Sequence, residues 1–180
     1  MTLSLHADDY LLRPLVPTDA PAMVTTVRES MASLGPWMPW AQAAYVETDA
    51  LAWIAACATA RADGTAHEFG IFRRDGHHYI GAAGLNQFNR AHRLCNLGYW
   101  VRASARRQGA GLAAIRALAC FAFDRLGQTR VEIVVADGNL SSLALARKAG
   151  AIHECLARNR LNLHGRPLAA HVLALVPETP

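Results

Sequence analysis

The alternation of apolar and polar residues along the chain predicts short strands interrupted by amphipathic helices. Apolar residues recur at helical spacing in four segments: 18–27, 48–62, 112–126 and 140–149. In the segment 48–62 this spacing places Leu51, Trp53 (or Ile54) and Ala58 on the inner face. Short runs rich in β-branched, aromatic and other apolar residues predict strands at 10–15, 68–72, 79–85, 97–101, 130–136, 161–163 and 168–176. The order β, α, α, β, β, β, α, β, α and a final hairpin predicts an α+β domain with a central, mixed but mostly antiparallel sheet flanked by helices.

Turn and cap residues mark the limits of several of these segments. Asp75-Gly76 between two strand-like runs predicts a hairpin, and Gly127 and Gly150 stand where helix C-termini are expected. Helix N-caps are expected at Thr18 or Asp19, at Thr48, and at Asn139 or Ser141, whose side chains can accept a hydrogen bond from the first turn. The proline-rich segment 34–40 is expected to be a loop.

Length and composition favour a globular protein. The 180 residues, 52% of them apolar, are expected to form a single domain over 1–180. The four cysteines are scattered, and the start of the chain lacks the features of a secretory signal. We therefore expect a cytoplasmic protein with reduced, mostly buried thiols, no membrane association and no metal.

The distribution of charge limits the classes of partner that this protein is expected to bind. The formal net charge of +4 rests on arginine, because Lys148 is the only lysine. There is no long basic run, so direct nucleic-acid binding is not expected, and a P-loop nucleotide site is excluded by its missing lysine motif. Binding of a small anionic cofactor accounts for the positive net charge as well as nucleic-acid binding would.

The segment 97–112 carries the strongest chemical signal. A strand at 97–101 is followed by Arg106-Arg107-Gln108-Gly109-Ala110-Gly111 and then by a helix. A glycine turn that opens a helix directs free backbone N–H groups and the positive end of the helix dipole to one point, and the arginines add whole charges. Such a turn binds phosphate, although a plain tight connection would use the same residue types.

The spacing Arg106-x-x-Gly109-x-Gly111 resembles the coenzyme A signature of the GNAT superfamily of acyl-CoA-dependent N-acetyltransferases. A second motif, in which Asn139 and Ser142 open a helix after a strand, is similar to the second coenzyme motif of that superfamily. The element order also agrees, so the resemblance covers nearly the whole chain and is strongest over 97–151. Trp37-Met38-Pro39-Trp40 resembles an element of the ribosomal-protein (RimJ/RimL-like) branch that borders the acceptor site.

The resemblance implies acetyl-CoA as co-substrate, without a metal. The backbone of the turn would hold the diphosphate, and the central strand, diverging from its neighbour near Gly98, would hold the pantetheine arm and polarise the thioester. The residues implied in cofactor binding are Tyr99, Trp100, Val101, Arg106, Arg107, Gln108, Gly109, Ala110, Gly111, Asn139 and Ser142.

The resemblance also implies roles on the acceptor side. Trp37, Trp40 and Asn86 are the expected substrate-binding residues, and Ser142 is the expected acid that protonates the departing thiolate. The resemblance does not identify the general base, because Asn96 stands where the branch tends to have a glutamate, and Leu161 and Ala169 replace two further carboxylates. Titratable candidates are Glu68, His92, Glu154 and His171.

The function expected from the sequence is acetyl transfer from acetyl-CoA to a primary amine, either a protein N-terminal α-amine or a small-molecule amine, by direct attack. A catalytically degenerate acyl-CoA-binding regulatory module is the alternative, and a thioester hydrolase or a nucleic-acid-binding protein are further classes to test. The acceptor, the acyl preference and the oligomeric state, with a homodimer as one option, stay open.

Overall fold

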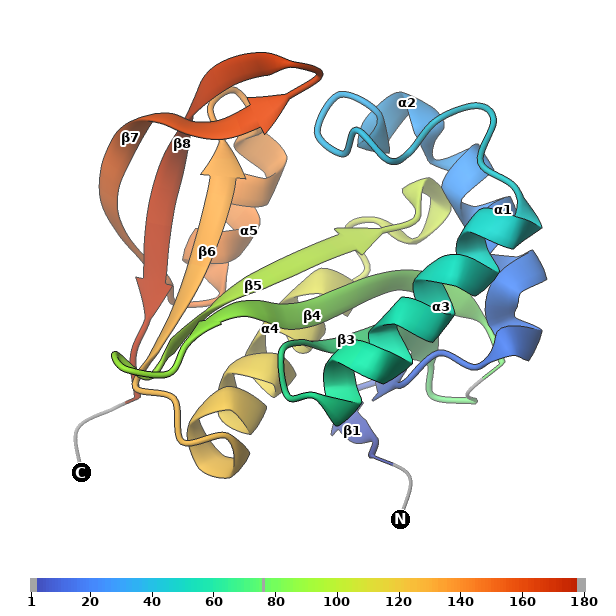
Figure 1. Cartoon of the computed structure of the whole chain (residues 1–180), viewed down its shortest axis with the longest axis horizontal. Helices are drawn as coiled ribbons and strands as arrows, with labels where there is room; N and C mark the ends of the chain where they lie inside the picture. Colours follow the sequence, from blue (N-terminus) through green and yellow to red (C-terminus); the bar gives the residue numbers. More distant parts are fainter. Residues whose placement is uncertain (1–2, 76, 178–180) are drawn as a thin grey trace.

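The computed structural model describes residues 3–75 and 77–177, which form one sheet flanked by helices (Figure 1). The sheet has eight strands in the order β1-β2-β3-β4-β5-β6-β8-β7. The strands are β1 (Leu5–Ala7), β2 (Tyr10–Arg13), β3 (His67–Arg73), β4 (Tyr79–Asn89), β5 (Leu94–Val101), β6 (Arg130–Ala136), β7 (Ile152–Leu163) and β8 (Arg166–Leu175). The helices are α1 (Ala20–Glu29), α2 (Met31–Leu34), α3 (Glu47–Ala62), α4 (Ala110–Cys120) and α5 (Leu140–Lys148).

Helices cover both faces of the sheet and divide the core in two. On one face α4 packs its small and branched residues, such as Ala114, Ile115 and Leu118, against Phe69 and Leu97 of the strands. On the other face α1 and α3 enclose a smaller cluster that is rich in aromatic residues: Phe72, Tyr79 and Trp100 from the sheet, with Tyr45 from the loop before α3. Burial of this apolar area is the main source of stability.

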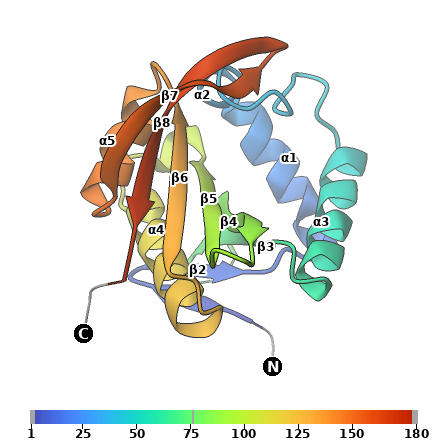
Figure 2. The same ribbon diagram turned by 60° about the vertical axis from the view of Figure 1, so that its left-hand side comes forward.

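Strands β5 and β6 part from each other halfway along the sheet. They are parallel and pair only at Leu94↔Arg130, Cys95↔Val131 and Asn96↔Glu132, whereas β5 runs on to Val101 and β6 to Ala136. Figures 1 and 2 show the two strands starting side by side and then separating. Residues 97–101 therefore keep their pairing with β4 and have no strand partner on the β6 side.

This divergence confirms the separation of strands predicted near Gly98. The strand itself carries no bulge there, because Gly98 pairs in register with Gly84, and the irregularity of this ladder lies between Asn86 and Asn89. The mixed, mostly antiparallel α+β sheet is likewise confirmed, as are the strand at 130–136, the helix opened by Asn139 and the hairpin of β3 and β4. Gly76, the predicted hairpin glycine, lies outside the described residues.

Four expectations about individual elements are wrong. The helix after 47 begins with Val46, and not Thr48, at the N-cap, because the Asp49 carboxylate accepts the Val46 N–H at 2.9 Å. Of the residues expected on its inner face, only Ile54, the alternative to Trp53, is buried, together with Ala50 and Cys57, whereas Leu51, Trp53 and Ala58 are exposed. Strand β7 begins at Ile152, nine residues before the predicted 161. The sequence did not indicate its first part, because this exposed edge strand lacks the alternation of apolar and polar residues that marks a half-buried strand. Two of the four thiols, Cys120 and Cys155, are exposed.

Over residues 3–75 and 77–177, no helix is long and apolar enough to cross a membrane. Within the same ranges, no group of three or more histidine, cysteine or acidic side chains is arranged to hold a metal ion.

Candidate active site

The turn between β5 and α4 leaves its backbone N–H groups free. Gly109 is the N-cap of α4 with φ +93°, and Arg107 also takes a left-handed conformation with φ 62°. Within the described part of the chain, the N–H groups of residues 107–112 donate to no other group, and the first amide bonded inside the helix is that of Ala113, to the Gly109 carbonyl at 3.0 Å. A Cβ at Gly109 would meet nothing within 4 Å. The turn is thus an open set of donors at the positive end of a helix dipole.

Contacts with the strands below hold this turn in place. The Tyr10 hydroxyl donates to the Gln108 carbonyl at 2.5 Å, and the Arg73 guanidinium donates to Gln108 Oε1 at 2.6 Å. Gln108 Nε2 in turn donates to the Ser104 carbonyl at 3.0 Å. The Gln108 side chain is therefore occupied within the fold, and only its backbone N–H is free for a ligand.

Gly111 has a packing role in addition to its free amide. A Cβ here would stand 2.7 Å from Leu145 Cδ2 of α5 and 3.6 Å from Val101 Cγ2 of β5. Ala110 beside it is also buried. The small residues of the turn thus let α4, α5 and the end of β5 approach one another, which the sequence motif alone did not predict.

The start of α5 meets β5 through a tyrosine and a serine. Tyr99 Oη lies 2.9 Å from Ser142 Oγ and 3.0 Å from the Ser142 carbonyl oxygen. Asn139 caps the helix, since its Oδ1 accepts the Ser142 N–H at 3.2 Å. Burial raises the pKa of the Tyr99 phenol, and its hydrogen bond with Ser142 opposes that effect. The phenol therefore stays protonated at neutral pH.

Arg106 connects the two predicted cofactor motifs. Its guanidinium donates to Ser141 Oγ at 3.2 Å, which links the glycine turn to the N-terminus of α5. Arg106 and Arg107 are both exposed, so their charges are available to an anion that lies on the free amides. The structure thus brings residues 106–111 together with Asn139 and Ser142 at the open end of the gap between β5 and β6.

The two loop tryptophans occupy different places. Trp40 packs on Trp100 with ring centroids 5.9 Å apart and leaves 43% of its own surface exposed. Trp37 lies near the turn before α5, because its Cη2 is 3.6 Å from the position of a Gly138 Cβ. Trp100 itself is buried on the face covered by α1 and α3, so only its main chain is available to a cofactor in the gap.

Asn86 belongs to a polar row on that same face of the sheet. Its Nδ2 donates to Glu68 Oε1 of β3 at 3.0 Å, and its Oδ1 accepts Asn96 Nδ2 of β5 at 3.0 Å. Burial raises the pKa of Glu68, while the bond from Asn86 and the charge of Arg61 oppose that rise. Sequence reasoning named Glu68 only as one of several titratable candidates, since its neighbours come from other strands.

The other titratable candidates lie away from this row. Glu154 forms an ion pair with Arg130 on the outer strands, and His92 lies in the exposed turn between β4 and β5. His171 contacts His153 at 2.9 Å and Asp137 at 3.5 Å on the outer part of the sheet. The Glu154 and His171 side chains are thus engaged in contacts of their own on the outer strands.

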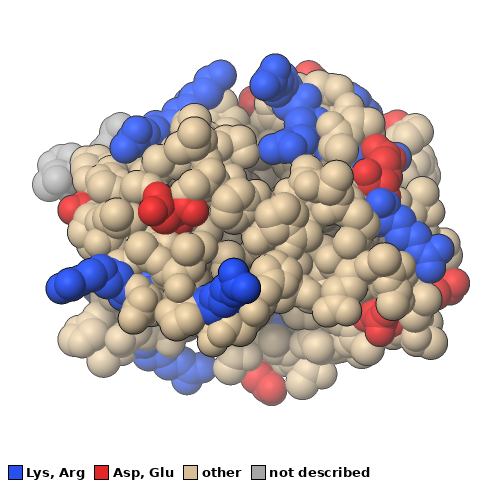
Figure 3. Space-filling view, turned by 90° about the horizontal axis from the view of Figure 1, so that it is seen from above, with Lys and Arg blue, Asp and Glu red and all other residues tan. Residues whose placement is uncertain are grey.

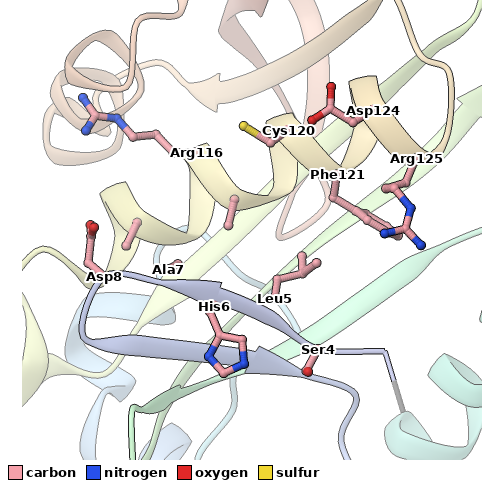
Figure 4. A pocket seen from close by; sticks show the side chains of 12 residues that line it. Ser4, Leu5, His6, Ala7, Asp8, Arg116, Cys120, Phe121, Asp124 and Arg125 are labelled. Atoms are coloured by element: carbon pink, nitrogen blue, oxygen red, sulfur yellow. The ribbon is translucent and has the colours of Figure 1, made fainter. Parts of the chain in front are cut away.

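Seen from above, uncharged residues form most of the surface, with separate basic and acidic side chains scattered over it (Figure 3). A cavity of about 540 Å³ lies elsewhere, between β1 and α4, where Arg116, Cys120 and Asp124 project from the helix (Figure 4). None of the predicted site residues lines it.

Comparisons with known proteins agree with this geometry. A family model described as an acetyltransferase (GNAT) domain matches residues 9–152. YdaF of Bacillus subtilis (strain 168), provisionally named a ribosomal N-acetyltransferase, is 30% identical over 159 residues, 86% of this chain and 84% of its own.

Solved structures share the fold. A Vibrio cholerae structure, provisionally titled a ribosomal-protein-serine acetyltransferase, is 34% identical, with a TM-score of 0.88 over 98% of this chain and 100% of that one. RimL, a ribosomal-protein α-N-acetyltransferase solved with coenzyme A, is 20% identical with a TM-score of 0.87 over 97% of this chain and 98% of its own, a likeness that shows the fold alone.

Proposed function

Because this chain belongs to the GNAT acetyltransferase family, we propose that it transfers the acetyl group of acetyl-CoA to a protein N-terminal α-amine. The family establishes an acetyl-CoA-dependent N-acetyltransferase, with amines as acceptors. The proposal adds the protein α-amine, which is supported by similarity to proteins named ribosomal acetyltransferases. A small-molecule amine is the competing acceptor, and an acceptor panel separates the two.

The observation that carries the proposal is the set of free N–H groups at residues 107–112, at the open end of the gap between β5 and β6. We assign the diphosphate of coenzyme A to these amides, with Arg106 and Arg107 adding charge. The pantetheine arm then follows the unpaired side of β5 at Tyr99, Trp100 and Val101, where main-chain groups have no strand partner. The thioester carbonyl would face a main-chain N–H of this strand, which stabilises its developing negative charge.

The reaction proposed is direct attack. The acceptor ammonium first loses one proton, and the lone pair of the neutral nitrogen forms a bond to the acetyl carbon. The nitrogen then loses its second proton to water, and the carbon–sulfur bond breaks with the electron pair leaving on sulfur. Ser142 Oγ–H donates a proton to that sulfur and is reprotonated through Tyr99, whose hydroxyl lies 2.9 Å away. The products are the acetylated amine and the free thiol of coenzyme A.

A matched pair of glycine variants tests the placement of the diphosphate. Gly109 and Gly127 both have positive φ and both have open space where a Cβ would stand, so alanine strains the backbone without a side-chain clash at each. Gly127 lies at the far end of the helical segment that follows the turn. We expect Gly109→Ala to weaken coenzyme A binding by about tenfold or more, which is the loss of one or two charge-assisted hydrogen bonds, and Gly127→Ala to leave it unchanged.

Isothermal titration calorimetry with coenzyme A measures both variants, and dephospho-coenzyme A and pantetheine separate the contributions of the two ends of the ligand. Equal affinity in the wild type and Gly109→Ala would remove the diphosphate from this turn. A free-thiol assay with peptides carrying a free or a blocked N-terminus, and with small amines, then identifies the acceptor.

A further inference from the structure

Two glycines in neighbouring strands form a hollow beside the end of the β5–β6 pairing. Gly84 of β4 and Gly98 of β5 face each other directly in the ladder. The Glu68 carboxylate fills the place of a side chain at Gly84, since a Cβ there would stand 1.8 Å from Glu68 Oε2. A Cβ at Gly98 would meet nothing within 4 Å, so the space above Gly98 is open.

The distance across this hollow suits proton transfer. Side-chain positions that face each other across two strands lie about 5 Å apart. A carboxylate at the Gly84 position therefore reaches a nitrogen above Gly98 directly or through one water molecule. Glu68 belongs to β3, so it reaches this point only because the adjacent position in β4 is a glycine.

The surroundings of the hollow match an acceptor site. Trp100 and Asn96 lie two residues to either side of Gly98 and share its face of the sheet, and Trp40 packs on Trp100. The row from Glu68 through Asn86 to Asn96 also fixes the direction of both amides. The Glu68 carboxylate accepts from Asn86 Nδ2, and Asn86 Oδ1 accepts from Asn96 Nδ2. The side-chain oxygen Oδ1 of Asn96 is therefore the acceptor at the end of the row, on the same face of the strand as Gly98.

We propose that Glu68 is the proton acceptor for the acceptor amine, acting from the Gly84 position across the open space above Gly98. This inference rests on the proposed acetyl transfer and adds the missing base to it. The ammonium form of the acceptor gives one proton to the Glu68 carboxylate, and the neutral nitrogen then attacks the acetyl carbon. The nitrogen loses its second proton to water as the carbon–sulfur bond breaks and the amide forms. Asn96 Oδ1 accepts an N–H of the same amine.

The other ionisable groups around Glu68 do not compete for this role. From α3, Cys57 and Arg61 face it, and burial raises the pKa of the Cys57 thiol to about 12, so that thiol stays neutral. The positive charge of Arg61 acts to lower the pKa of Glu68 and so favours the ionised carboxylate. Burial nevertheless raises the pKa of Glu68 above its ordinary value of 4.5, toward the range in which a carboxylate is a useful base.

The test compares acetyl transfer by the wild type and by Glu68→Gln, which keeps the shape and the bond from Asn86. For a peptide with an ordinary free N-terminus we expect kcat to fall by about a hundredfold or more, with an unchanged dissociation constant for coenzyme A. The acidic limb of the wild-type kcat profile, with its midpoint above pH 4.5, should disappear in the variant. A peptide with a fluorinated N-terminal residue, whose α-amine is already neutral at pH 7, should restore most of the lost rate, because no proton has to be removed before its nitrogen attacks.

A second variant and a control complete the experiment. Gly84→Ala should displace the carboxylate and reproduce the defect of Glu68→Gln, whereas Glu154→Gln, which alters a carboxylate paired with Arg130, should not change kcat. Wild-type rates and pH dependence in both Glu68→Gln and Gly84→Ala would overturn the assignment of Glu68 alone. A wild type that binds coenzyme A but acetylates no amine would instead overturn the proposed function and this inference with it.

Discussion

Tyr99 Oη and Ser142 Oγ lie 2.9 Å apart, across residues that are 43 positions distant in the chain. The tyrosine comes from the unpaired part of β5 and the serine from the first turn of α5, so the bond joins the two sides of the gap. The same phenol lies 3.0 Å from the Ser142 carbonyl oxygen, so the single proton of the phenol has two oxygen atoms, the carbonyl O and Oγ of Ser142, that can accept it. This arrangement lets a proton pass between the phenol and the serine hydroxyl.

Replacing Ser142 by alanine should therefore lower turnover much more than cofactor affinity. We expect kcat to fall by about a hundredfold, the usual contribution of a positioned acid, with a change of less than about threefold in the dissociation constant of coenzyme A. Tyr99→Phe should give a smaller loss, because water can still reprotonate the serine. Steady-state kinetics and calorimetry measure the two quantities, and an unchanged kcat in Ser142→Ala would exclude its role as acid.

Arg106→Gln should weaken coenzyme A binding in a salt-dependent manner. The side chain is exposed and bonded to Ser141 Oγ, so its charge acts on the proposed diphosphate through solvent. We expect a loss of about tenfold at low ionic strength that shrinks at ~1 M salt, where charges are screened over about 3 Å. Arg125→Gln, at the other end of this helical segment, is the control, and a loss independent of salt would contradict the electrostatic role.

Trp40→Ala should raise the KM for the acceptor and leave coenzyme A binding unchanged. The ring is 43% exposed and packs on Trp100, so it forms part of the wall beside Gly98. An aromatic contact with a bound acceptor contributes about 1 kcal/mol, which is about a fivefold change in KM. Trp53→Ala is a matched control, because Trp53 is 44% exposed on the outer side of α3. Equal KM values for the two variants would remove Trp40 from the acceptor site.

Glu29→Gln should make the fold less sensitive to acid. Its ion pair with Arg102, followed by a bond from Ser104, lowers the pKa of Glu29 from 4.5 to about 2. A carboxylate with a lowered pKa stabilises the fold above pH 4.5, and that contribution is lost as the pH falls from 4.5 toward 2.

The magnitude of this effect is small, because the pair is partly exposed to solvent. We expect less than about 1 kcal/mol at neutral pH. Urea unfolding at pH 7 and pH 3 should show wild type and variant converging at the lower pH. A difference that is the same at both pH values would assign the effect to packing.

The sequence predicted those parts of the site that lie close together along the chain. The glycine turn and the Asn139 cap are local patterns, because φ at Gly109 and the bond from Ser142 N to Asn139 depend on neighbours within a few residues. Glu68 could not be placed in the same way. Its position depends on the register of three strands, and a shift of one residue would turn it to the opposite face.

The buried face of α3 shows a second limit of sequence reasoning. Leu51, Trp53 and Ile54 are the large apolar residues of the segment, yet the helix buries only Ile54 of these, together with the smaller Ala50 and Cys57. The space between α3 and the sheet already holds Phe72, Tyr79 and Trp100, which come from distant positions. Small residues on the facing helix fit that space better than large ones.

The unpaired side of β5 also makes the free energy of unfolding depend on the concentration of a ligand that binds there. Without a ligand, main-chain groups of residues 97–101 depend on solvent for their hydrogen bonds on that side. A ligand that binds only the native chain adds about 2.7 kcal/mol to its unfolding free energy at a hundred times the dissociation constant. The thermal midpoint should therefore rise with the logarithm of the free acetyl-CoA concentration, and the fraction of unfolded chains should fall with it.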